Sequence, residues 1–122
     1  MQEHKRDAVM PEGRWAFDAD VTAAFDDMLE RSIPQYQVMR EAVTGLALRY
    51  ARDGTDVVDL GCARGEAAAP IIDALGARCR YVLADVSEPM LAASAARYDA
   101  MMRAGVVRVE SCDLRDRYPQ SH

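Results

Sequence analysis

The sequence predicts an α/β protein in which two N-terminal helices precede a β-α-β-α-β unit with a parallel sheet. Three observations support this prediction. The apolar spacing is helical before residue 54 and strand-like directly after it. Three short apolar segments then alternate with helical patterns. Strands that alternate with helices imply a parallel sheet with right-handed crossovers.

Two helical patterns open the chain. Apolar residues share one face over residues 20–30, and a second apolar stripe runs to about Tyr50. Ser32 and Gln35 resemble a capping box at the start of the second helix, with Pro34 inside its first turn. The turn-forming pair at 53–54 is expected to end this helix.

The β-α-β-α-β unit follows from residue 56. We expect strands over 56–60, 80–84 and 106–111, because these runs are short and rich in β-branched residues. Helices are expected over 66–75, with Pro70 near its first turn, and over 90–103, with Ser87 as the N-cap.

Length and charge limit the range of functions. The 122 residues fit one domain, which we place at 15–116 between a flexible segment (1–14) and a polar tail (117–122). The formal net charge is -5 and the pI is about 4.9, which argues against direct nucleic-acid binding. No apolar run approaches the length of a membrane span, and residues 1–11 do not resemble a signal peptide.

The cysteines and histidines give no sign of a metal site. Cys62, Cys79 and Cys112 form no closely spaced pair, and His4 and His122 lie near the chain ends. We therefore expect no metal and interpret the thiols as reduced, which is typical of a cytoplasmic protein.

The residues that follow the strands carry the candidate site. A loop with Gly61 and Gly65 follows the first strand, where the small side chains allow a ligand to approach the backbone. Asp59, Asp85 and Asp113 fall at the ends of the three strands. Ligands of open α/β sheets bind at the carboxyl ends of the strands, so we expect one ligand to touch all three loops.

The loop does not fit a dinucleotide. The G-x-G-x-x-G pattern needs glycine at 61, 63 and 66, but Ala63 and Glu66 occupy two of these positions. A carboxylate at the helix start repels a pyrophosphate and suits a cation, such as the sulfonium and ammonium of S-adenosylmethionine (SAM). Asp85 is placed to accept from both ribose hydroxyls, and Asp113 from the adenine amino group. A NAD-dependent oxidoreductase is therefore disfavoured.

The same residues resemble known motifs. Asp59-x-Gly61-x-Ala63-x-Gly65 resembles the first motif of class I SAM-dependent methyltransferases, residues 85–91 the second, and residues 112–114 the third. The upstream stretches WAFD at 15–18, FDDM at 25–28 and RSIPQY at 31–36 are similar to the carboxy-SAM synthase group of tRNA-modifying enzymes. The resemblance implies a Rossmann-like methyltransferase fold.

The resemblance also implies a function and a set of contacts. It implies a SAM-dependent methyltransferase that binds SAM, or its product S-adenosylhomocysteine (SAH), and transfers a methyl group to an acceptor that the sequence does not identify. The residues that match cofactor contacts in that group are Tyr36, Gly61, Cys62, Ala63, Asp85, Val86, Asp113 and Leu114.

Other roles stay open. Asp59 and Gly65 complete the predicted cofactor site, although Asp59 equally suits a role in orienting the loop, and Cys62 suits a small buried residue better than a nucleophile. Methyl transfer depends mainly on proximity and orientation, so no catalytic residue is named.

The chain departs from the family pattern at its C-terminal end. The family fold has seven strands, and this sequence is expected to form three, so the first strand is expected at a sheet edge. Its apolar run is unusual for a free edge, and we expect a second copy or a partner subunit to cover it. The residues that select the acceptor are not found, which leaves a non-catalytic SAM-binding or interaction module as the alternative. Carboxy-SAM synthesis is not supported.

Overall fold

The computed structural model of the protein describes residues 28–29 and 31–120. The expected segment at 1–14 and most of the expected helix at 20–30 lie outside the described residues. The elements in order are α2 (Tyr36–Tyr50), β1 (Asp56–Leu60), α3 (Ala69–Leu75), the short 3₁₀ helix η3 (Gly76–Arg78), β2 (Arg80–Asp85), α4 (Glu88–Arg97), α5 (Asp99–Arg103) and β3 (Val107–Ser111).

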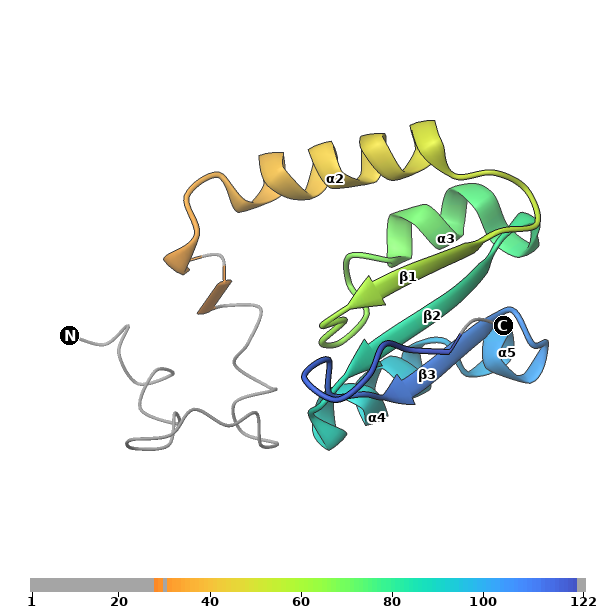
Figure 1. The fold of residues 1–122 in the computed structure, drawn as a ribbon. Coiled ribbons are helices and arrows are strands. Elements are labelled where there is room, and N and C mark those ends of the chain that lie inside the picture. Colours follow the sequence, from red (N-terminus) through yellow and green to blue (C-terminus); the bar gives the residue numbers. More distant parts are fainter. Residues whose placement is uncertain (1–27, 30, 121–122) are drawn as a thin grey trace.

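The sheet confirms the predicted α/β class. Its strands are parallel and follow the order β1-β2-β3, with α3 and α4 as the crossovers (Figure 1). Val58 lies opposite Val82, and Leu83 lies opposite both Asp59 and Val109. Since all strands run the same way, their carboxyl ends meet at one edge of the sheet, where the glycine loop begins.

The start of α3 differs from the prediction. The helix was expected from residue 66, but it begins at Ala69, and residues 66–68 form turns. Proline has no N–H group and a φ angle that suits the first turn of a helix, so Pro70 marks the true start. The loop after β1 is therefore longer than expected.

The expected helix over 90–103 is two helices. α4 and α5 are separated at Tyr98, whose φ of -112° and ψ of 28° are not helical. The break coincides with the contact of the Tyr98 hydroxyl with the carbonyl of Gly65, at 2.6 Å. The predicted N-cap is confirmed, because the Ser87 hydroxyl accepts from the backbone N–H of Met90.

The predicted capping box before α2 is wrong. The helix begins at Tyr36, and Gln35 precedes it with a φ of 55° and no capping bond from its side chain. Proline disfavours helical geometry in the residue before it, so Pro34 belongs to the turn that precedes the helix rather than to its first turn.

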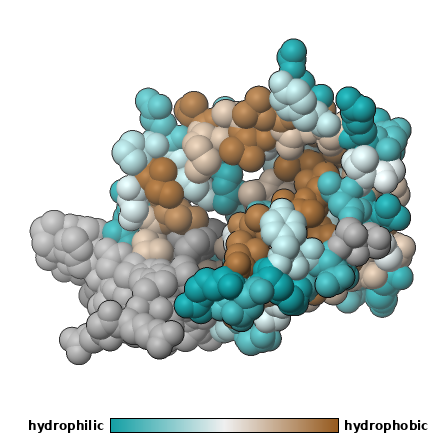
Figure 2. Space-filling model, in the orientation of Figure 1, coloured by the Kyte–Doolittle hydropathy of each residue, from teal (hydrophilic) through white to brown (hydrophobic). Residues whose placement is uncertain are grey.

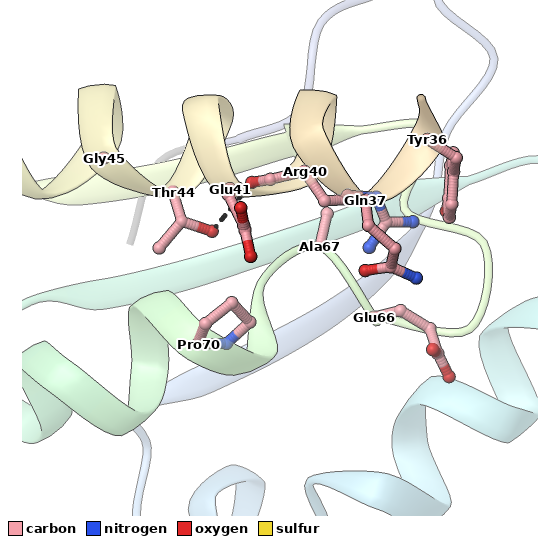
Figure 3. A pocket seen from close by; sticks show the side chains of 9 residues that line it. All are labelled: Tyr36, Gln37, Arg40, Glu41, Thr44, Gly45, Glu66, Ala67 and Pro70. Carbon is pink, nitrogen blue, oxygen red and sulfur yellow. Dashed lines mark hydrogen bonds between the residues drawn. The ribbon is translucent and has the colours of Figure 1, made fainter. Parts of the chain in front are cut away.

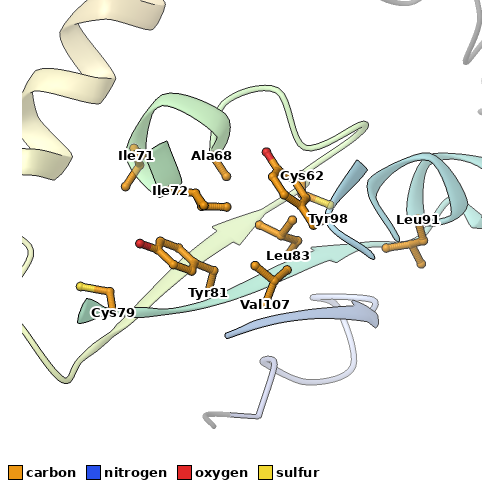
Figure 4. Close-up of a cluster of buried hydrophobic side chains, with 10 residues drawn as sticks. All are labelled: Cys62, Ala68, Ile71, Ile72, Cys79, Tyr81, Leu83, Leu91, Tyr98 and Val107. Carbon is orange, nitrogen blue, oxygen red and sulfur yellow. The ribbon is translucent and has the colours of Figure 1, made fainter. Parts of the chain in front are cut away.

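The core lies between the sheet and α3 and α4 (Figure 4). Tyr81 and Leu83 of β2 are almost fully buried, as expected for the central strand of a parallel sheet. The buried cluster consists of Cys62, Ala68, Ile71, Ile72, Cys79, Tyr81, Leu83, Leu91, Tyr98 and Val107. The helix α2 contributes no buried residue.

The α2 side of the molecule is exposed. Hydrophobic side chains gather along α2 and around the hollow that separates it from the sheet (Figure 2). Val38 and Leu46 are more than half exposed. Among the described residues β1 pairs only with β2, so it lies at an edge of the sheet as predicted. That a second copy or a partner covers this edge stays a prediction.

Candidate functional site

The glycine loop crosses the carboxyl end of β2. The N–H groups of Gly61 and Cys62 both donate to the carbonyl of Ala84, at 2.8 and 2.9 Å. Gly61, Ala63 and Gly65 all have positive φ angles of 51° to 80°. Glycine adopts this geometry without strain, whereas an alanine does not, so the loop is held in a shape that Ala63 disfavours.

Asp85 joins two loops at the end of β2. Its Oδ2 atom accepts from the N–H of Ala63 at 2.9 Å. Its Oδ1 atom accepts from the N–H groups of Val86 and Ser87 at 2.8 and 3.0 Å. Carboxylate oxygens have further lone pairs, so these bonds orient the group and leave capacity for ligand hydroxyls. The predicted ribose contact of Asp85 fits this geometry and stays a prediction.

Two residues that sequence analysis missed hold the loop by hydrogen bonds to its carbonyls. The Ser94 hydroxyl donates to the carbonyl of Ala63 at 2.8 Å, and the Tyr98 hydroxyl donates to that of Gly65 at 2.6 Å. Ser94 lies in α4, and Tyr98 directly follows its last residue. Two hydroxyl groups four residues apart were the available signal in the sequence.

Gly65 is required by packing against α4. A Cβ atom at this position would lie 2.8 Å from Tyr98 Cε2 and 3.2 Å from Ser94 Oγ. A Cβ atom on Gly61 would meet nothing within 4 Å. The two glycines therefore serve different purposes: Gly61 is favoured by its positive φ alone, and Gly65 also lets the loop pack against Ser94 and Tyr98.

The side chain of Cys62 belongs to the core. It is 4% exposed, and its Sγ atom lies 3.8 Å from Ser94 Oγ. Burial raises the pKa of the thiol to about 12, so the group stays protonated at neutral pH and is no nucleophile. Any contact of Cys62 with a ligand must therefore come from its backbone.

The three loops converge on one pocket of about 230 Å³, as the strand ends predict. Asp85 lines it, and so do the exposed side chains of Val86 and Leu114. The pocket is lined by Gly61, Ala84, Asp85, Val86, Cys112 and Leu114. Two apolar side chains above a carboxylate form a surface that suits a ribose joined to a flat base.

Asp113 is engaged by its neighbour. The Arg115 guanidinium donates to both carboxylate oxygens, at 2.6 to 3.2 Å, and the N–H of Arg115 donates to Oδ1. The hydrogen bonds from Arg115 lower the pKa of Asp113 to about 2. Of the three predicted carboxylates, Asp85 alone is among the residues that line the 230 Å³ pocket. The predicted adenine contact of Asp113 stays a prediction.

Asp59 lies on the face of the sheet that the helices cover. It lines a second, largely apolar pocket of about 180 Å³, together with Val43 of α2 and Leu83 of β2. The pKa of its carboxyl is raised, mainly by burial. The positive charge of Arg40 acts against this rise, and the negative charge of Asp85 adds to it. Its Oδ2 atom is buried and has no hydrogen-bond partner. A buried acceptor without a donor is costly, so the site favours a ligand that supplies one.

A larger cavity of about 510 Å³ separates α2 from the glycine loop (Figure 3). Tyr36 and Arg40 line it from α2, and Glu66 lines it from the loop below. Glu66 pairs with Arg97 of α4 at 2.5 Å. The cavity is therefore bordered by both signs of charge. Tyr36 lines it opposite Glu66, and the predicted cofactor contact of Tyr36 stays a prediction.

Two absences hold for the part of the chain that the structure describes. No three His, Cys, Asp or Glu residues there are grouped so that they could hold a metal ion. None of its helices has both the length and the apolar character needed to cross a bilayer.

Fold and site together define a class: an open parallel α/β protein with a pocket at the carboxyl ends of its strands. Known proteins make the class specific. Residues 16–114 match the ubiE/COQ5 methyltransferase family, and the chain belongs to that family. This match confirms the predicted class I SAM-dependent methyltransferase.

The chain is similar to curated carboxy-S-adenosyl-L-methionine synthases. It is 39% identical to that of Sodalis glossinidius over 80 residues, which cover 65% of this chain and 32% of that enzyme. It is 32% identical to that of Citrobacter koseri over 105 residues, which cover 85% of this chain and 42% of that enzyme. The chain thus spans less than half the length of these relatives.

A solved structure supports the fold. Geranyl diphosphate methyltransferase, determined in complex with GPP and sinefungin, matches with a TM-score of 0.54 at 20% identity. The match covers 88% of this chain and 36% of that one. It agrees with a partial Rossmann-like methyltransferase fold.

Proposed function

We propose that this protein is a SAM-dependent methyltransferase that binds SAM at the carboxyl ends of its parallel strands and transfers the methyl group to an acceptor. The observation that carries the proposal is the pocket on which all three strand-end loops converge, with Asp85 among its lining residues. Family membership supports the same cofactor. Ribose hydroxyls would donate to Asp85, and the base would lie between Val86 and Leu114.

The site supplies binding and orientation rather than acid–base chemistry. A sulfonium is already an activated methyl donor, so an enzyme gains most of its rate by holding the acceptor in line with the methyl group. The buried, protonated thiol of Cys62 agrees with this mechanism, because it is no base or nucleophile at neutral pH. The chain's own contribution is a rigid loop, held by Asp85, Ser94 and Tyr98.

Calorimetric titration with SAH tests the proposal. The wild-type protein is expected to bind SAH, and Leu114→Asp is expected to weaken binding by about tenfold or more, because it places a charge against the base. Leu46→Asp is the matched control, since Leu46 is equally exposed but lies on α2 away from this pocket. Absence of SAH binding to the wild-type protein, or binding of NAD in its place, would overturn the proposal.

A cofactor-binding module without transfer activity is the second candidate. It is supported by the pocket at the strand ends, whose lining residues can hold a cofactor on their own. Two results together would support it: the protein binds added SAH, and no SAH is formed from SAM when candidate acceptors are present. Production of SAH in the presence of an acceptor would exclude it.

We also propose that a second copy of the chain covers β1, and that the protein works in the cytoplasm. The free edge of β1 continues into the apolar side chains of α2 through the pocket that Val43, Val57 and Val58 line, and such an edge is a template for pairing. Three buried free cysteines support a reducing compartment. Light scattering is expected to give twice the chain mass of 13.5 kDa, and a stable monomer would overturn the dimer.

A further inference from the structure

The family resemblance assigns no role to Arg40, yet its environment is unusual. It lies on α2, is half-buried, and lines the 510 Å³ cavity beside the glycine loop (Figure 3). Among the described residues it forms no ion pair, although Glu41 and Glu66 line the same cavity. A half-buried cation without a carboxylate partner is destabilising unless an anion approaches it.

The structure holds the Arg40 side chain in place. Its guanidinium carbon lies 4.9 Å from the centre of the Tyr36 ring, one turn earlier on α2. A cation–π contact of this kind favours this position of the guanidinium and uses none of its N–H groups as hydrogen-bond donors. Five N–H donors in a rigid fork match a carboxylate.

An opposite charge lies close by, across the loop. Asp59 faces the neighbouring 180 Å³ pocket, and Ala67 lines both this pocket and the larger cavity. The electrostatic effect of Arg40 on the pKa of Asp59 shows that the two groups sense each other. The buried Oδ2 atom of Asp59 has no donor. One cation that lacks an anion and one carboxylate that lacks a donor together complement a zwitterion.

We infer that Arg40 binds the carboxylate at the amino-acid end of the cofactor, while Asp59 faces its ammonium group. This inference rests on the proposed function, because it assumes that the adenosyl end occupies the pocket beside Asp85. Arg40 thereby selects a cofactor with an intact amino acid over adenosyl ligands without one. The same fork suits a carboxylate on the acceptor, and the experiment separates these two sources.

Titrations of two ligands with three proteins test the inference. SAH carries the amino acid, whereas 5′-methylthioadenosine lacks it. We expect Arg40→Met to lower the affinity for SAH by about tenfold to a hundredfold and to leave that for methylthioadenosine unchanged. Arg49→Met is the matched control on the exposed last turn of α2, with both affinities within about twofold of wild type.

Each other outcome has a defined meaning. If Arg40→Met loses affinity for both ligands equally, Arg40 only supports the fold. If its SAH affinity is unchanged, Arg40 does not bind the cofactor and an acceptor carboxylate is its remaining partner. Either result overturns the inference. If the wild-type protein binds neither ligand, the proposed function itself fails. A second measurement needs no variant: wild-type protein is expected to bind SAM more tightly than decarboxylated SAM, by the same factor, and equal affinities overturn the inference.

Discussion

The two sides of the glycine loop are built in opposite ways. Towards α4 the loop is held by hydrogen bonds from Ser94 and Tyr98 to its carbonyls, and at the end of β2 Asp85 accepts from the N–H of Ala63. Towards α2 it borders a cavity of about 510 Å³, under a helix that contributes no buried residue. The loop is thus held by hydrogen bonds on the α4 side, and an open cavity lies on the α2 side.

This contrast predicts where substitutions matter most. Leu83→Ala is expected to destabilise the protein by about 2 to 5 kcal/mol, because Leu83 is 1% exposed at the centre of the core. Leu46→Ala on α2 is expected to change stability by less than about 0.5 kcal/mol, because that side chain is 58% exposed. Urea unfolding measures both. A comparable loss for Leu46→Ala would show that the side chain of Leu46 is covered in solution.

The two loop glycines sharpen the comparison. Gly65→Ala is expected to cost about 3 kcal/mol, because the new Cβ atom meets the Tyr98 ring at 2.8 Å in addition to the strain of a positive φ. Gly61→Ala adds strain alone and is expected to cost about 1 to 2 kcal/mol. Equal unfolding midpoints for the two variants would show that the loop does not rest on α4.

The sequence predicted the sheet better than it predicted the loop environment. The strands could be predicted because short β-branched runs alternate with helical ones, and their ends pointed to the edge of the sheet where the 230 Å³ pocket lies. The contacts of Ser94 and Tyr98 could not be predicted, since they depend on how α4 is placed against a loop some thirty residues earlier. The start of α2 was misjudged because Pro34 fits both a turn and a first helical turn.

The different environments of the three carboxylates also could not be predicted from their spacing in the sequence. Asp59, Asp85 and Asp113 are equivalent by position, each at a strand end. In the structure one is half-buried with a buried Oδ2 atom, one is fixed by backbone N–H groups, and one is held by Arg115. The face on which a side chain lies and the neighbour that follows it in the loop decide these differences.

Asp59 predicts a smaller effect that depends on pH. Burial raises the pKa of its carboxyl above 3.8, so the folded state binds the proton more tightly than the unfolded state. Stability therefore falls as pH rises from the ordinary pKa through the folded one, and it stays lower at neutral pH. Asp59→Asn removes this loss and is expected to be more stable than wild type at about pH 7, with a flatter pH profile.

The control for this variant is Asp73→Asn, on the exposed face of α3. Chemical unfolding of the three proteins between about pH 4 and pH 7 separates the effects. A neutral-pH stability of Asp59→Asn at or below that of wild type would indicate that the charge of Asp59 is compensated, and the electrostatic effect of Arg40 is the first candidate.

Ala63→Gly is expected to have the smallest effect on the unfolding free energy, and to increase it where the other loop substitutions lower it. Its φ of 51° strains any residue with a Cβ atom, by about 1 to 2 kcal/mol. Ala63→Gly relieves this strain but adds freedom to the unfolded chain, which costs about 0.5 to 1 kcal/mol. The net gain in unfolding free energy is therefore expected to be below about 1 kcal/mol. A loss of stability would mean that the methyl group of Ala63 contributes packing that outweighs the strain, so that alanine rather than glycine is the better residue for this loop. SAH affinity, measured on the same samples, is expected to stay unchanged, because the bonds from Ser94 and to Asp85 use only the backbone of residue 63.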